Sequence, residues 1–137
     1  MPPPAAPRRV RVAALLEAVG PTVWIDQEAQ MDAVTAVSGS GPAYVFLLAE
    51  AMQAAGEAQG LAPAAARALV NQTLLGAATM LSRSDESAEV LRARVTSPGG
   101  TTQAAIETFE TGGLRPLVAA AIAAASERGR ELSAAND

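Results

Sequence analysis

Apolar residues recur at helical spacing in five segments after about residue 40, and Gly or Pro separates most of these segments. Two of the segments open at Pro42 and Pro63, and proline suits the first turn of a helix, where backbone N–H groups have no helical partner. A third has Asp85 and Glu86 in its expected first turn and arginines in its last, which complements the helix dipole. The segments cover about 42–60, 63–81, 85–94 and 102–111, and the last has Pro116 in its first turn and runs to Leu132. Short joins between helices of this length predict an all-α helical bundle of about five helices.

The first 30 residues follow a different pattern. Val12, Leu15, Leu16 and Val19 lie on one face of a predicted helix over 9–19, and the apolar run 22–25 predicts one short strand. A single strand cannot form a sheet, so we expect its partners to be absent or supplied by another chain. We therefore expect residues 1–30 to hold a disordered Pro-rich start and a fragment of something larger, and 31–137 to form the helical domain.

Composition changes this picture in one respect. Of the 137 residues, 33 are alanine, whereas only four are Phe, Trp or Tyr. Alanine favours helices but fills little volume, so a single copy would have a thin core. Alanine-faced helices can also approach one another closely. We therefore expect the helical domain to complete its core by forming a homodimer or a higher homo-oligomer.

The charged and reactive side chains exclude several classes of function. The chain has no Cys and no His, which excludes disulfides, thiol nucleophiles and the commonest metal ligand, and we predict no metal site and no catalytic side chain. A net charge of −4 argues against a nucleic-acid partner, and no apolar stretch is long enough to cross a membrane. Without a recognisable targeting signal, we expect a cytoplasmic protein. The acidic residues Glu107 and Glu110 are expected on a solvated helix face.

Residues 39–44, Gly-Ser-Gly-Pro-Ala-Tyr, match the first two glycines of a dinucleotide-binding fingerprint. The third glycine is replaced by Tyr44, and no acidic residue lies about 20 positions further on to hold a ribose. A tight entrance to the helix at Pro42 is the better interpretation, and a nucleotide site here is not expected.

Residues 96–102, Thr-Ser-Pro-Gly-Gly-Thr-Thr, combine a helix stop, two glycines and the start of another helix. Such a turn can direct several backbone N–H groups into one concavity, where the helix dipole favours an anion such as a small carboxylate or phosphate. The alternative is an ordinary capped turn whose threonines bond only to their own helix. The residues alone leave both interpretations open.

Three blocks of this sequence together resemble the C-terminal domain of the pyrroline-5-carboxylate reductase family. They are Asp-Ala-Val-Thr-Ala-Val-Ser-Gly-Ser-Gly-Pro-Ala-Tyr at 32–44, Leu-Leu-Gly-Ala at 74–77 and Val-Thr-Ser-Pro-Gly-Gly-Thr-Thr at 95–102. The resemblance covers about 22–133, and 9–25 are similar to the last helix and strand of the family's Rossmann domain. It implies an interlocked dimer of helical domains, of the kind found at the C-terminus of 6-phosphogluconate dehydrogenase.

The resemblance also implies a reaction and a site. The family transfers hydride from NADPH or NADH to the imine carbon of 1-pyrroline-5-carboxylate and forms L-proline. Backbone N–H groups of Gly100, Thr101 and Thr102 would hold the substrate carboxylate, the Thr102 hydroxyl would add a bond, and Ser97 and Gly99 would complete the loop. Ser38 would approach the nicotinamide end of the cofactor.

The strand, Gly-rich turn and helix that open the family's Rossmann domain do not occur in this sequence, so we expect this chain alone to bind no cofactor and to be inactive as a reductase. Three hypotheses follow. The chain is a dimerising reductase module that binds proline-like carboxylates, an enzyme completed by a Rossmann part on a separate chain, or a nonenzymatic helical oligomerisation module with no ligand.

Overall fold

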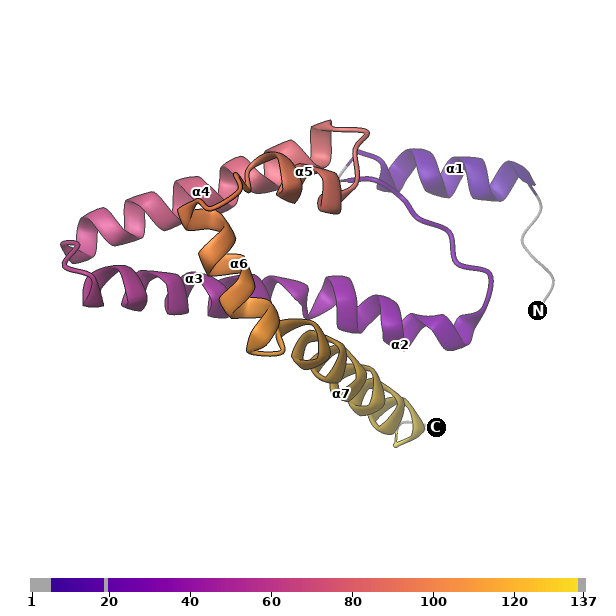
Figure 1. The fold of residues 1–137 in the computed structure, drawn as a ribbon. Coiled ribbons are helices and arrows are strands. Elements are labelled where there is room, and N and C mark those ends of the chain that lie inside the picture. Colours follow the sequence, from indigo (N-terminus) through magenta and orange to yellow (C-terminus); the bar gives the residue numbers. More distant parts are fainter. Residues whose placement is uncertain (1–5, 19, 136–137) are drawn as a thin grey trace. The chain divides into compact units, whose positions relative to one another are not determined.

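The computed structural model describes residues 6–18 and 20–135 (Figure 1). The expected disordered start falls partly on residues 1–5, and the first predicted helix ends on Val19; both lie outside the described residues. The chain divides into two compact units, the first ending at Met31 and the second beginning at Asp32.

The first unit contains helix α1 (Ala6–Leu16) and a single-turn 3-10 helix, η1 (Glu28–Gln30). Helix α1 begins three residues before the predicted start, and the chain then turns at Gly20-Pro21, the predicted stop. The predicted strand over 22–25 is wrong: this segment has no regular secondary structure. A strand is defined by hydrogen bonds to a neighbouring strand, and no described residue of this chain supplies one.

The second unit is helical throughout, as the spacing of apolar residues predicts. Its elements are α2 (Met31–Val34), whose first residue is the last of the first unit, the π-helical segment η2 (Thr35–Gly39), α3 (Gly41–Ala58), α4 (Pro63–Arg83), α5 (Ala88–Arg94), α6 (Thr101–Thr111) and α7 (Leu114–Ala134). The five predicted helices correspond to α3 to α7, and the prolines expected in the first turns of α3 and α4 are found there. The all-α prediction is confirmed for this unit.

Helix α5 begins later than predicted. Asp85 and Glu86 precede it, because Ser87 is the N-cap residue and its hydroxyl accepts a hydrogen bond of 3.3 Å from the Val90 N–H. The Ser84 hydroxyl accepts from the Glu86 N–H at 3.1 Å, which turns the chain just before the cap. Serine is among the strongest N-cap residues, so it determines the helix start here more than acidic charge does.

The π-helical segment before α3 has a physical cause in Pro42. Proline lacks an N–H and its ring clashes with the carbonyl four residues earlier, so a regular α-helix cannot continue through this position. The structure instead loosens the preceding turn, and the Ser40 N–H donates to the Thr35 carbonyl at 2.8 Å, five residues back. The Ala36 carbonyl thereby loses its usual helical donor and accepts from the Tyr44 hydroxyl at 3.1 Å.

Helices α3 and α4 pack as an antiparallel pair joined by a short turn at 59–62 (Figure 1). Gly60 lies in this turn with a φ of 96°, a conformation that favours glycine. Helix α7 packs on η2, and it also approaches α2: a Cβ at Gly129 would lie 2.9 Å from the Asp32 carboxylate oxygen Oδ1. Only glycine allows this approach without a shift of Asp32.

The core of this chain is small. Among the residues whose burial is described, the buried apolar side chains are Ala36, Ala66, Val70 and Leu91. Helix α3 has exposed apolar residues at consecutive positions, and Phe46 and Leu47 are 64% and 66% exposed. A helical stretch that is apolar on all sides is normally buried. The thin core expected from the alanine content is therefore present, and α3 is the main surface left uncovered.

Candidate functional site

Residues 97–100 form a tight turn that fits the type II pattern. The Gly100 N–H donates to the Ser97 carbonyl at 3.0 Å, Pro98 occupies the second position, and Gly99 has a φ of 71° at the third. A Cβ at Gly100 would lie 3.1 Å from the Ser97 carbonyl oxygen, tighter than an ordinary contact. The two glycines therefore act differently, because Gly99 supplies the positive φ and Gly100 allows the chain to close on Ser97.

The turn leads directly into α6, whose N-cap is Gly100. The first N–H groups of a helix have no partner within it, and the first helical bond here runs from the Ala104 N–H to the Gly100 carbonyl at 3.2 Å. Neither threonine caps the helix through its hydroxyl. In the described part of the chain, the N–H groups of Thr101, Thr102 and Gln103 therefore remain without an acceptor, at the positive end of the helix dipole.

One of the donors that the family resemblance implies is already engaged within the turn. The family resemblance implies that Gly100 offers its N–H to a ligand, but that N–H is used inside the turn. The turn type explains the difference, because its hydrogen bond joins the first and fourth residues. The available donors begin at Thr101, and Gly99 and Gly100 shape the loop that presents them.

A side-chain network supports the same turn, and the sequence reasoning missed it. The Gly99 N–H donates to the Gln103 side-chain carbonyl at 2.7 Å, and the Gln103 amide donates to the Glu107 carboxylate at 2.6 Å. The signal is present in the spacing, since residues four apart on a helix are neighbours and Gln103 lies four positions from both partners. Glu107 is exposed, as expected, but it is engaged in this network.

Ser38 lies in η2, and its hydroxyl donates to the Val34 carbonyl at 2.8 Å. This bond points within its own helical segment, so a role of Ser38 toward a cofactor stays a prediction. The Gly-Ser-Gly-Pro-Ala-Tyr sequence at 39–44 forms the joint between η2 and α3, and Ser40 has helical torsion angles. It is an entrance to α3, as predicted.

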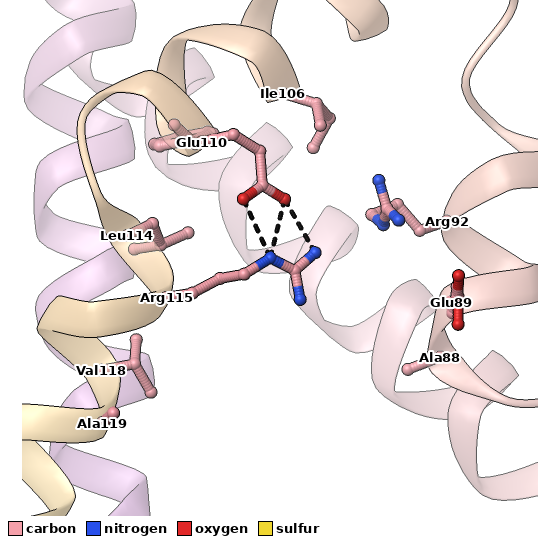
Figure 2. A pocket seen from close by; sticks show the side chains of 10 residues that line it. Ala88, Glu89, Arg92, Ile106, Glu110, Leu114, Arg115, Val118 and Ala119 are labelled. Carbon is pink, nitrogen blue, oxygen red and sulfur yellow. Dashed lines mark hydrogen bonds and ion pairs between the residues drawn. The ribbon is translucent and has the colours of Figure 1, made fainter.

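A separate pocket of about 810 Å³ lies between α5, α6 and α7 (Figure 2). Within it, Arg115 and Glu110 form a two-pronged ion pair, with Nε 2.9 Å from both carboxylate oxygens and an Nη2–Oε1 distance of 2.7 Å. The hydrogen bonds from Arg115 lower the pKa of Glu110, and those to Glu110 raise the pKa of Arg115. The pocket contains no residue of the 97–102 loop. The residues that line it are Ala88, Glu89, Arg92, Ile106, Phe109, Glu110, Leu114, Arg115, Val118 and Ala119.

The described residues contain no group of three or more His, Cys, Asp or Glu side chains placed to hold a metal ion. Across the described helices, none combines the length and the apolar character needed to cross a membrane.

Taken together, these features define a class of protein: a helical domain with a large uncovered apolar helix and a glycine turn that presents backbone donors at a helix start. A family model described as pyrroline-5-carboxylate reductase dimerisation matches residues 28–132. The chain belongs to this family, and the resemblance noted in the sequence is confirmed.

Curated relatives and solved structures agree with this assignment. A pyrroline-5-carboxylate reductase of Pseudomonas aeruginosa is 56% identical over 119 residues, covering 87% of this chain and 44% of that protein, and one of Arabidopsis thaliana is 49% identical over 122 residues, covering 89% and 44%. A structure of a pyrroline-5-carboxylate reductase from Coxiella burnetii has a TM-score of 0.90 and 44% identity, over 93% of this chain and 47% of that one. The Plasmodium falciparum enzyme, solved with NADP bound, has a TM-score of 0.78 and 33% identity, over 90% and 47%. The chain spans less than half the length of these relatives.

Proposed function

We propose that this chain forms the dimer interface and the substrate-carboxylate loop of a pyrroline-5-carboxylate reductase. The observation that carries the proposal is the start of α6, where the N–H groups of Thr101, Thr102 and Gln103 lack acceptors next to a turn closed by Gly99 and Gly100. A carboxylate suits this position because it accepts several N–H hydrogen bonds and interacts favourably with the helix dipole. The Thr102 hydroxyl, which caps no helix, is available as one more donor.

The reaction proposed for the complete enzyme needs orientation more than a reactive side chain. A bound NADPH or NADH would supply a hydride to the imine carbon of 1-pyrroline-5-carboxylate, and the ring nitrogen, protonated as the iminium, would keep its proton in the product, L-proline. The cofactor supplies the reducing electrons, and this chain's part is to fix the substrate by its carboxylate. A domain without His or Cys is compatible with that role.

Residues 1–137 lack the features of a dinucleotide-binding site. The only Gly-x-Gly segment near a helix start in this sequence, 39–41, is helical and lacks the third glycine. We infer that these residues alone bind no NADPH or NADH and do not reduce the imine, with Ser38 contributing only at the edge of a cofactor held elsewhere. Purified chain mixed with imine and NADPH should leave the nicotinamide absorbance unchanged; turnover at the rate of a complete reductase contradicts this.

The direct test of the carboxylate loop is an amide titration of the ¹⁵N-labelled chain. L-Proline should move the amide signals of Thr101, Thr102 and Gln103, whereas pyrrolidine, which has the same ring without a carboxylate, should not. Thr102→Ala should weaken the binding of proline by removing one hydroxyl donor, and Thr108→Ala on the same helix is the matched control. If proline moves none of these signals, the nonenzymatic oligomerisation module becomes the better description.

A further inference from the structure

The Gln103 side chain makes two short hydrogen bonds that point in opposite directions. Its carbonyl oxygen accepts from the Gly99 N–H at 2.7 Å, and its amide nitrogen donates to the Glu107 oxygen Oε1 at 2.6 Å. Gly99 needs an acceptor and Glu107 needs a donor, so the two partners together fix which way the amide is turned. The side chain is thus held at both ends before any ligand binds.

This arrangement determines which donors of the loop are free. The Gly100 N–H is bonded to the Ser97 carbonyl, and Gln103 takes the N–H of Gly99. Without the Gln103 side chain, the Gly99 N–H would be one more unpaired donor. No side chain would then stabilise the positive φ of Gly99 by a hydrogen bond. The network therefore separates a locked turn, 97–100, from the donors at the start of α6.

The geometry points to Gln103 as a positioning residue for the carboxylate loop, with Glu107 as its support. This inference rests on the proposed function and adds to it a residue that acts through Gly99. Fixing a loop in its binding conformation in the free protein improves affinity, because less conformational freedom is lost on binding. Gln103 thus has two parts: its backbone N–H belongs to the donor set, and its side chain holds the turn beside it.

The test uses the 137-residue chain and two readouts, the hydrogen-exchange rate of the Gly99 amide and the dissociation constant for L-proline. Gln103→Met keeps the length and helix propensity of the side chain but removes both hydrogen bonds. One hydrogen bond of this kind corresponds to a change of about two- to tenfold, so both the exchange rate and the dissociation constant should rise by about that factor. Glu107→Met should move both readouts less in the same direction, and Glu107→Gln, which retains an acceptor for the Gln103 amide, should restore them.

Thr108→Ala is the control, because it removes a hydroxyl bond of 2.9 Å to the Ala104 carbonyl on the same helix without touching the turn. It should change neither readout. If Gln103→Met speeds exchange at Gly99 but leaves proline binding unchanged, Gln103 only stabilises the turn and the inference is overturned while the proposed function stands. If the unaltered chain shows no proline shifts at Thr101 and Thr102, the proposed function fails and the role of Gln103 fails with it.

Discussion

Replacing Phe46 by alanine should dissociate the proposed dimer. Phe46 lies on α3, is 64% exposed in the single chain, and is the largest apolar side chain in the uncovered run of that helix. Aromatic residues are over-represented among the side chains that dominate interface energies. The change leaves the helix intact, because alanine has a higher helix propensity than phenylalanine.

The size of the effect can be worked from the exposed fraction. A phenylalanine side chain buries about 150–250 Å² when fully covered, so 64% exposure leaves about 100–160 Å² for a partner. At about 25 cal/mol per Å² this corresponds to about 2.5–4 kcal/mol per protomer. A twofold interface includes the residue twice. If half of this area is buried in the dimer, the two copies together lose about 2.5–4 kcal/mol, so the dissociation constant should rise about 60- to 700-fold.

Sedimentation velocity from nanomolar to high micromolar concentration measures this constant. Glu50→Gln is the matched control, since Glu50 is an exposed residue of the same helix and the change removes a charge without removing apolar area. Circular dichroism should show unchanged helix content for both variants. A Phe46→Ala protein that dimerises within threefold of the unaltered chain would refute the assignment of α3 to the interface.

Three further changes test separate parts of the fold. Tyr44→Phe leaves the buried Ala36 carbonyl without its hydroxyl donor, so the free energy of unfolding, measured by urea denaturation, should fall by about 1–3 kcal/mol. The control Thr79→Ala removes an exposed hydrogen bond to the Leu75 carbonyl and should lower that free energy by less than about 0.5 kcal/mol. Gly99→Ala should lower the free energy of unfolding by about 1–2 kcal/mol because of the positive φ at this residue, and it should weaken proline binding. The control Gly76→Ala lies in mid-helix with open space around it, and it should leave the free energy of unfolding unchanged or raise it by up to about 1 kcal/mol. The ion pair with Arg115 lowers the folded-state pKa of Glu110. Its small contribution to stability is therefore present above the ordinary glutamate pKa of about 4.3 and is lost as the pH falls through the lowered value. Unfolding measured from pH 6 to pH 2 should show this loss, and Glu110→Gln should abolish this component of the pH dependence.

The helices are predictable because their apolar spacing and their first-turn prolines agree. Pro42 and Pro63 both open helices where expected, and Gly112-Gly113 ends α6. Two features are not predictable from propensity alone. The start of α5 depends on which of several nearby polar residues caps it, and the segment 22–25 depends on a neighbouring strand that the described residues do not provide.

The turn at the candidate site is predictable from the sequence, but its individual donors are not. The sequence of residues 96–102 leaves an anion-binding turn and an ordinary capped turn both open, and its Ser-Pro-Gly-Gly core is typical of a type II turn. The hydrogen bond of such a turn consumes the Gly100 N–H, a step that the sequence reasoning missed. The π-helical segment at 35–39 could not be predicted from the sequence. It depends on which carbonyl accepts each N–H hydrogen bond once Pro42 removes one donor.

The site's dependence on backbone donors determines where it is sensitive to substitution. Apart from proline, no exchange of a side chain removes the N–H groups of Thr101 and Thr102, so other substitutions abolish the donor set only if they move the backbone. Gly99 and Gln103 control that backbone through a torsion angle and a hydrogen bond, respectively. Substitutions at these two residues should therefore weaken carboxylate binding at least as much as Thr102→Ala does. Neither residue is expected to touch the ligand through a side chain, since Gly99 has none and the Gln103 side chain bonds to Gly99 and Glu107. An active site organised around a reactive side chain would show the opposite order, which makes the ranking of these variants a test of how the loop works.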